Sequence, residues 1–200
     1  MKPAQVFIAT AAAVIVLGFG ASTSAAGRFS TSHQSFRATF ASWEIGGLFG
    51  TTTCALTLEG SLHSRTISKV VGTLIGYITS ARSGACASLT AAVLTETLPW
   101  HLRYGAFTGS LPGITAIRTN IVGYAFSLRE TGGITCLVRS TEGEPATLTY
   151  TREGSGGLIS ATLGGAIRSA AECFGARFTI GGSSNSLANE AGSRITITLI

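Results

Sequence analysis

Residues 53–59 read Thr-Cys-Ala-Leu-Thr-Leu-Glu, a strict alternation of apolar and small or polar side chains. Successive side chains of a β-strand point to opposite faces, so Cys54, Leu56 and Leu58 would share one face of an extended chain. The residues between them would share the other face. This pattern predicts a strand with one side in a hydrophobic core and the other in water.

The same period of two recurs along most of the chain. It continues at 134–138, 174–180 and 194–199. Further strands are expected at 35–43, 70–79, 91–97, 101–108, 117–128, 146–152 and 158–163. A short helix is expected only at 164–173. Many short strands with Gly- and Pro-containing turns between them predict an all-β protein, either an antiparallel β-sandwich or a closed barrel.

Composition supports the β prediction. Charged residues make up 12% of the chain, about half the usual share, whereas Ser and Thr together number 49. The surface must therefore be built largely from hydroxyl groups, and Thr suits strands better than surface helices. All nine acidic residues are Glu, and the 12 Arg residues are scattered singly. Without a run of basic residues to follow a phosphate backbone, a nucleic-acid partner is not expected.

The first 26 residues are typical of a secretory signal peptide. Lys2 gives a positive start, and an uncharged apolar run of 15 residues follows at 6–20. Small residues at Ser24 and Ala26 suit the cleavage site. A membrane-spanning helix needs about 20 apolar residues, so an uncleaved anchor is the less favoured alternative. The rest, residues 27–200, is expected to be one β-domain in contact with the membrane only transiently, or two related halves at about 35–130 and 131–200.

Four cysteines indicate an oxidising compartment outside the cytoplasm. Cys54, Cys86, Cys136 and Cys173 can pair in three ways. Their spacing favours Cys54 with Cys86 and Cys136 with Cys173. Zinc ligation is disfavoured because no Cys-x-x-Cys pair occurs.

No catalytic, cofactor or metal site is expected from the motifs. No Gly-x-Ser-x-Gly elbow and no His-Glu-x-x-His pair occurs, and His33, His63 and His101 lie far apart in the sequence. Two nearby carboxylates could in principle cleave a glycosidic bond. However, Glu142 and Glu144 lie in Glu-Gly-Glu-Pro, which is typical of a solvated turn. The sequence therefore favours a protein that is not an enzyme.

The densest group of chemically versatile side chains is Thr-Glu-Thr-Leu-Pro-Trp-His-Leu-Arg-Tyr at 95–104. Pro99 should place a corner there between two strands. In a binding role, aromatic rings beside a guanidinium could stack on a sugar or an aromatic ligand. In the favoured structural role, Trp100 plugs the core while Glu96 and Arg103 pair across the corner. The candidate ligand-binding residues are Glu96, Trp100, His101, Arg103 and Tyr104.

This run, together with Leu-Ile-Gly-Tyr-Ile-Thr at 74–79 and Gly-Ile-Thr-Cys-Leu-Val-Arg-Ser-Thr-Glu-Gly-Glu-Pro-Ala at 133–146, resembles an uncharacterised family of exported actinobacterial proteins. The resemblance spans roughly residues 50–180. It implies export and a β-rich fold, and it carries no activity, cofactor or catalytic residue.

Three functions are therefore weighed. The first is an exported, non-catalytic binding or structural module, extracellular or in the cell envelope, with a polysaccharide or an envelope protein as partner. The second is a secreted hydrolase using Glu96, His101 and Arg103. The third is an outer-envelope β-barrel pore, which would turn its apolar residues outward. A binding module should expose an aromatic patch that includes Trp43 or Trp100.

Overall fold

The computed structural model describes residues 28–47, 50–110, 113–129, 133–152, 158–169, 173, 176–184 and 186–199. The expected signal peptide, residues 1–26, lies outside them. The strands are β1 (Phe29–Thr31), β2 (Ser35–Gly47), β3 (Gly50–Leu62), β4 (Thr66–Ile67), β5 (Leu74–Cys86), β6 (Thr90–Val93), β7 (Trp100–Ser110), β8 (Gly113–Val122), β9 (Ala125–Arg129), β10 (Thr135–Arg139), β11 (Ala146–Arg152), β12 (Leu158–Ser169), β13 (Arg177–Ser184), β14 (Ser186–Ala188) and β15 (Ile197–Leu199). A short 3-10 turn, η1 (Thr95–Thr97), precedes β7.

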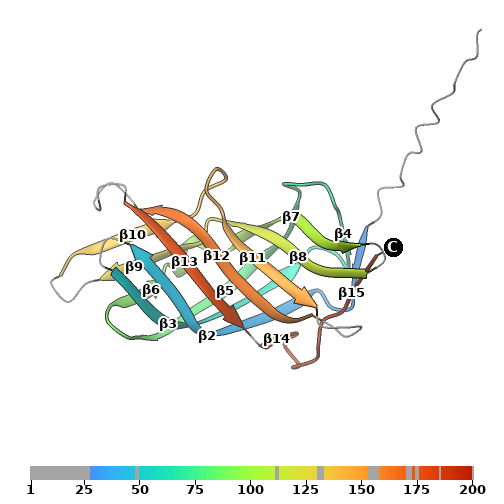
Figure 1. Ribbon diagram of the computed structural model, residues 1–200, viewed down its shortest axis with the longest axis horizontal. Coiled ribbons are helices and arrows are strands. Elements are labelled where there is room, and N and C mark those ends of the chain that lie inside the picture. Colours follow the sequence, from blue (N-terminus) through green and yellow to red (C-terminus); the bar gives the residue numbers. More distant parts are fainter. Residues whose placement is uncertain are drawn as a thin grey trace, which may run out of the picture.

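The all-β prediction is confirmed, and the architecture is a closed antiparallel barrel. Eight strands pair in chain order, namely β2, β3, β5, β7, β8, β11, β12 and β13. The ring closes where β13 returns to β2, with Ile180 opposite Ile45. Closure pairs both edges of the sheet, so the barrel wall exposes no unpaired strand edge along this seam. Figure 1 shows the barrel from the side.

The alternation seen in the sequence sorts side chains between the inside and the outside of the barrel. In β3, Cys54, Leu56 and Leu58 are buried, while the residues between them are exposed or half-buried. A single core of apolar side chains fills the interior. Each fully buried large apolar side chain stabilises the fold by roughly 1.5–3 kcal/mol. The inward apolar faces of eight strands therefore hold the barrel together.

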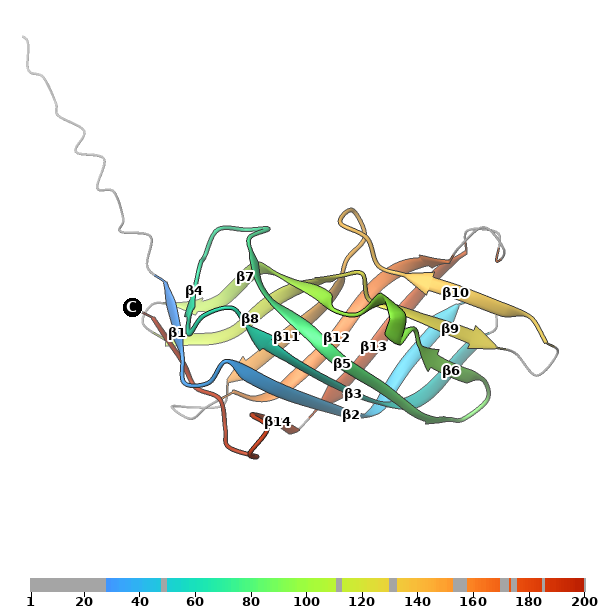
Figure 2. The ribbon, with the colours of Figure 1, turned by 180° about the vertical axis from the view of Figure 1, so that it is seen from behind.

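Shorter strands extend the barrel at its two ends (Figures 1 and 2). At one end β6, β9 and β10 form a three-stranded extension, which joins the barrel where β10 pairs with β12. At the other end β1 pairs with both β4 and β15 in a small separate sheet. Phe29 of β1 packs its ring against Tyr104 and Phe107 of β7, with ring centroids 6.1 and 5.6 Å apart. The small sheet is thereby anchored on the barrel core.

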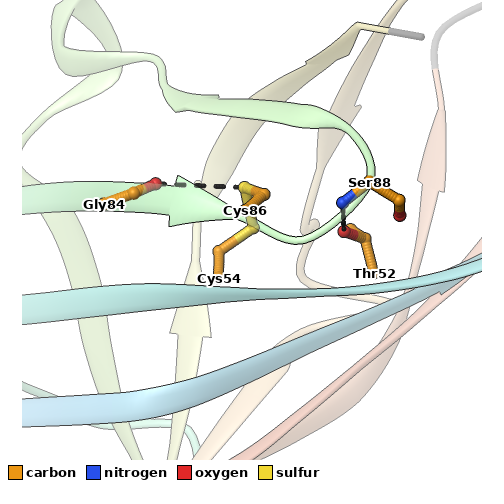
Figure 3. The surroundings of a disulfide bond; sticks show 5 residues. All are labelled: Thr52, Cys54, Gly84, Cys86 and Ser88. Carbon is orange, nitrogen blue, oxygen red and sulfur yellow. Dashed lines mark hydrogen bonds between the residues drawn. A yellow bond between two sulfur atoms is a disulfide. The ribbon is translucent and has the colours of Figure 1, made fainter. Parts of the chain in front are cut away.

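Two disulfides staple the fold with the pairing that the spacing favoured, Cys54 with Cys86 and Cys136 with Cys173. Cys54 and Cys86 are direct partners in the β3–β5 pairing. Figure 3 shows this bond at the end of β5, where the backbone amide of Ser88 also donates to the Thr52 hydroxyl at 3.3 Å. Such bonds are typical of proteins that reside in an oxidising compartment outside the cytoplasm.

Several sequence expectations need correction. The helix expected at 164–173 is wrong, because β12 continues as a strand to Ser169. Its backbone pairs with β13 on one side and with β11 and β10 on the other, and this pairing overrides the weak local helical pattern. The strand expected at 117–128 is divided into β8 and β9 by a break at Gly123, whose φ of 88° suits glycine. Strands of both expected halves, 35–130 and 131–200, contribute to the one barrel.

Among the described residues, no helix has the length and apolar character needed to cross a membrane.

Candidate functional site

The dense group at 95–104 divides between the two faces of the barrel wall. Trp100 and Tyr104 point into the core, and Trp100 is only 1% exposed. The Trp100 indole donates from Nε1 to the Thr97 hydroxyl at 2.8 Å and packs against Tyr124, with ring centroids 4.7 Å apart. His101 follows Trp100 in the strand and Arg103 precedes Tyr104, so these two side chains face outward. The period of two in β7 therefore removes the two largest rings from the surface.

The ion pair expected between Glu96 and Arg103 is not formed. Arg103 instead donates from Nη2 to Oε1 of Glu142 at 2.7 Å. Glu96 lies in η1, before the strand begins, with its side chain exposed at the surface. Arg103 lies further along β7, on the outer face that the turn carrying Glu142 overhangs. Distance along the strand thus separates two residues that are close in sequence.

Arg103 forms part of a hollow on the outside of the barrel, which we call the outer pocket. Its volume is about 210 Å³. Two strands and two turns line it, through the residues Gly72, Arg103, Asn120, Val122, Glu142 and Pro145. The turns between β4 and β5 and between β10 and β11 stand on the same side of the barrel in both views (Figures 1 and 2). The pocket lies between them, with β7 and β8 as its floor.

Arg103 is held in a fixed position in this pocket. Its Nη1 donates to the backbone carbonyl of Gly72 at 3.0 Å, and its Nη2 binds Glu142. Its Nε is buried and has no hydrogen-bond partner among the described residues. The side chain is 32% exposed, against 72% for Glu142. A partly exposed guanidinium that a backbone contact holds in place can donate to a further acceptor.

A row of three rings runs across the outer face beside the pocket, and we call it the ring row. Tyr77 of β5 lies between His63, just after β3, and His101 of β7. The ring centroids are 4.8 Å apart for His63 and Tyr77 and 5.4 Å apart for Tyr77 and His101. His101 is the direct cross-strand partner of Val122, which lines the outer pocket. The row and the pocket are therefore one continuous surface.

Two exposed valines add an apolar rim. Val70 and Val71 are 64% and 70% exposed, and they immediately precede Gly72 of the pocket lining. These two side chains place apolar surface beside the polar lining of the pocket. The surface thus offers apolar, aromatic and charged groups side by side.

A second hollow lies at the end of the barrel covered by β1 and β15. Its cavity volume is about 30 Å³, and its walls are mainly apolar, with Phe36, Ile117 and Tyr150 among the lining residues. A volume of this size holds little more than water. The outer pocket has a volume of about 210 Å³ and a charged and polar lining, so it is the better candidate for a ligand.

Acid–base groups do not converge in the outer pocket. Its lining contains Arg103 and Glu142 but neither Glu96 nor His101. Glu142 and Glu144 form ion pairs with different strands. Glu142 pairs with Arg103 of β7, and Glu144 pairs with Arg177 of β13, each at 2.7 Å. Within the described ranges, no three His, Cys, Asp or Glu side chains gather into a group that could hold a metal ion. The surface offers hydrogen-bonding groups and rings side by side.

The tyrosines of the core add no titrating group near neutral pH. Burial raises the pKa of Tyr104 above its ordinary value of 10.0 and raises the pKa of Tyr124 well above it. Burial likewise raises the pKa of Tyr150, against a smaller opposing effect of its hydrogen bond with Thr119. All three phenols therefore stay neutral.

Sequence reasoning found Arg103 and His101 but missed Tyr77, His63 and Asn120. The exposed aromatic patch that a binding module was expected to form with Trp43 or Trp100 is not found, because both are buried, and for Trp100 this agrees with the favoured structural role in the core. Tyr77 belongs to the quoted run at 74–79, but its face is decided by a register shift between Leu74 and Gly76. The only signal in the sequence was that Tyr77 lies within an expected strand. That signal does not place its ring near His101.

Comparison with known proteins found no matching family model, no matching curated protein and no matching solved structure.

Proposed function

We propose that this protein is an exported, non-catalytic binding module that holds a polysaccharide on the outer face of its barrel. The observation that carries the proposal is the continuity of the ring row with the outer pocket, through the pairing of His101 with Val122. A row of rings suits an extended ligand, and a pocket at its end suits one residue of that ligand.

A sugar polymer matches the chemistry of this surface. Sugars present C–H faces that pack on aromatic rings and hydroxyl groups that need several hydrogen-bond partners. Tyr77 and His101 supply the rings, and Arg103, Asn120 and Glu142 supply planar polar groups. The pocket is smaller than the roughly 300–1,000 Å³ of typical small-molecule sites. It is better suited to one unit of a chain than to a whole drug-sized ligand.

The non-catalytic part of the proposal rests on the placement of Glu96 outside the pocket and on the engagement of Arg103 by another residue. Glu96 lies in η1, His101 belongs to the ring row, and Arg103 is engaged with Glu142. A secreted hydrolase remains the alternative. It would require the acid and the base to meet across a bound substrate.

The pore alternative receives less support from the outer face. Outward positions of β2 and β3 carry polar side chains such as Arg37, Glu44, Thr57 and Glu59. A membrane-spanning barrel places apolar residues there. Export is supported by the signal-like residues 1–26, by the two disulfides and by the resemblance to exported actinobacterial proteins.

Retention by polysaccharides tests the proposal. Affinity electrophoresis through gels that contain single soluble polysaccharides, neutral or acidic, should retard the protein in at least one. Tyr77→Ala and His101→Ala should each weaken that retardation by roughly fivefold or more, the usual scale for lost ring stacking. Thr39→Ala, an exposed change on β2 outside the surface, is the matched control and should behave as wild type.

Two results would contradict the proposal. One is that no polysaccharide retards the protein. The other is that retardation occurs but Tyr77→Ala and His101→Ala leave it unchanged, which would place the binding site elsewhere.

A further inference from the structure

From the surroundings of Arg103 we infer that the bound polysaccharide is acidic, and that Glu142 occupies the place of a ligand carboxylate until the ligand displaces it. This inference rests on the proposed function, because it names the class of polysaccharide that the same site takes.

The Arg103 side chain is built to receive a carboxylate. Its Nη1 is fixed on the Gly72 carbonyl, so the guanidinium stays in position whatever Nη2 binds. Its Nη2 already holds a carboxylate at 2.7 Å, that of Glu142. Guanidinium and carboxylate are geometrically matched, and pairs between them are stronger than neutral hydrogen bonds. The guanidinium thus already pairs with a carboxylate, which is the group that we infer the ligand supplies.

Glu142 can leave this position at low cost. Its side chain is 72% exposed, and it lies in a turn next to Gly143, which has no other atom near the place of a Cβ. Exposed ion pairs contribute little to stability because water solvates the separated charges nearly as well. Arg103, by contrast, is only 32% exposed and keeps its contact with Gly72. Exchange of the Glu142 carboxylate for that of a ligand leaves Arg103 paired throughout.

A sugar acid fits better than an acidic protein segment. The charged group of the pocket lies beside a row of rings, through His101 and its partner Val122. A chain of uronic acids carries a carboxylate and a stackable ring on each residue, so one residue can fill the pocket while its neighbours cover the ring row. An acidic peptide supplies the charge without the rings.

The experiment measures the affinity of the full mature chain for three polymers. They are sodium polygalacturonate, the same polymer with its carboxyl groups methyl-esterified, and poly-L-glutamate. The first variant, Glu142→Gln, removes the competing carboxylate. Arg103→Gln removes the charged guanidinium, and Arg103→Lys keeps the positive charge but removes the planar arrangement of donors. Glu59→Gln is the matched control, because Glu59 forms an ion pair of the same kind with Arg37 at 2.6 Å outside the pocket.

We expect wild type to bind polygalacturonate and to bind its methyl ester and polyglutamate much more weakly. Glu142→Gln should tighten binding of polygalacturonate by roughly twofold to fivefold, the scale of a competing exposed ion pair. Glu59→Gln should not. Arg103→Gln should weaken binding by about tenfold or more, as for a lost charged hydrogen bond. Arg103→Lys should also bind more weakly than wild type, although it keeps the charge.

Equal gains from Glu142→Gln and Glu59→Gln would overturn the inference, because they would reduce the effect to net charge. Unchanged or weaker binding by Glu142→Gln would also overturn it, since Glu142 would then not compete with the ligand. Equal binding of the methyl ester, or of polyglutamate, would reject a sugar acid as the ligand. If a neutral polysaccharide is retained and polygalacturonate is not, this inference fails while the proposed function stands. If nothing is retained, the proposed function fails as well.

Discussion

Trp100 and His101 are neighbours in the sequence, and they lie on opposite faces of the barrel wall. The indole is buried against Tyr124, while the imidazole stands outside beside Tyr77. One peptide step along β7 therefore separates a residue that holds the fold from one that we assign to binding. Substitutions at the two residues can therefore test the structural role and the binding role independently.

Trp100→Ala should destabilise the protein by about 3–5 kcal/mol, because it removes a large buried ring and leaves a cavity. His101→Ala should change stability by less than about 0.5 kcal/mol, as for most surface substitutions. Urea denaturation followed by circular dichroism measures both. A Trp100→Ala protein as stable as wild type would show that the indole is not part of the core.

Tyr124→Phe should leave the free energy of unfolding unchanged or raise it. The Tyr124 hydroxyl is buried and has no hydrogen-bond partner in the described part of the chain. Removing such a group recovers a desolvation cost of about 1–3 kcal/mol. Tyr150→Phe is the control, because it loses the hydrogen bond with Thr119 and should be destabilised. A loss of stability in Tyr124→Phe would mean that its hydroxyl has a partner.

Stability should fall in alkali. The raised pKa values of Tyr104, Tyr124 and Tyr150 keep these phenols protonated in the folded state, whereas the unfolded chain loses those protons near pH 10. The folded state then binds more protons than the unfolded state, so their contribution is fully present below about pH 10 and is lost as pH rises further. The slope is up to about 1.4 kcal/mol per pH unit for each tyrosine. Urea titrations between pH 8 and pH 12 would show it, and Tyr124→Phe should make the decline shallower.

Removing either disulfide should cost stability through the unfolded chain. The two bonds close loops of similar length, with sequence separations of 32 and 37 residues. Loop entropy predicts a loss of roughly 4 kcal/mol for each. Paired Cys→Ala variants at Cys54 and Cys86, and at Cys136 and Cys173, allow the two to be compared by chemical denaturation. A loss below about 1 kcal/mol in either variant would contradict the estimate.

Gly60→Ala should be strongly destabilising, whereas Gly143→Ala should not. A Cβ at Gly60 would overlap the backbone carbonyl oxygen of Tyr77 and the ring of Phe36, so β3 and β5 would have to move apart. Overpacking of this kind costs about 1–3 kcal/mol. Gly143 has no atom within 4 Å of the Cβ position. Thermal denaturation of the two variants compares them, and equal midpoints would refute the close approach.

The faces of single strands could be predicted from sequence, because alternation is local. Cys54, Leu56 and Leu58 share a buried face as their spacing requires. The choice between a sandwich and a barrel could not be predicted. It depends on the pairing of β2 with β13, and Ile45 and Ile180 carry no local sign of one another.

The candidate site was less accessible to sequence reasoning for the same reason. Arg103 and Glu142 are 39 residues apart and meet only because β8 to β10 return the chain to β7. Tyr77 and Ile75 share a parity in sequence, which would place both on one face. The register shift next to Ile75 breaks that rule, so Ile75 is buried and Tyr77 is partly exposed.

Closure of the barrel between β2 and β13 also constrains the order of folding. Chains are synthesised from the N-terminus, so β2 is made long before its last partner. Until β13 follows, β2 presents an open edge that could pair with another chain. Such long-range pairing is slow, because the entropy of a large loop is lost before any contact forms. The pairing of β3 with β5 closes a much shorter loop, needs no such wait and can be locked by Cys54 and Cys86. The route to the folded state is thus expected to run outward from this covalently locked strand pair, with the seam of the barrel sealed last.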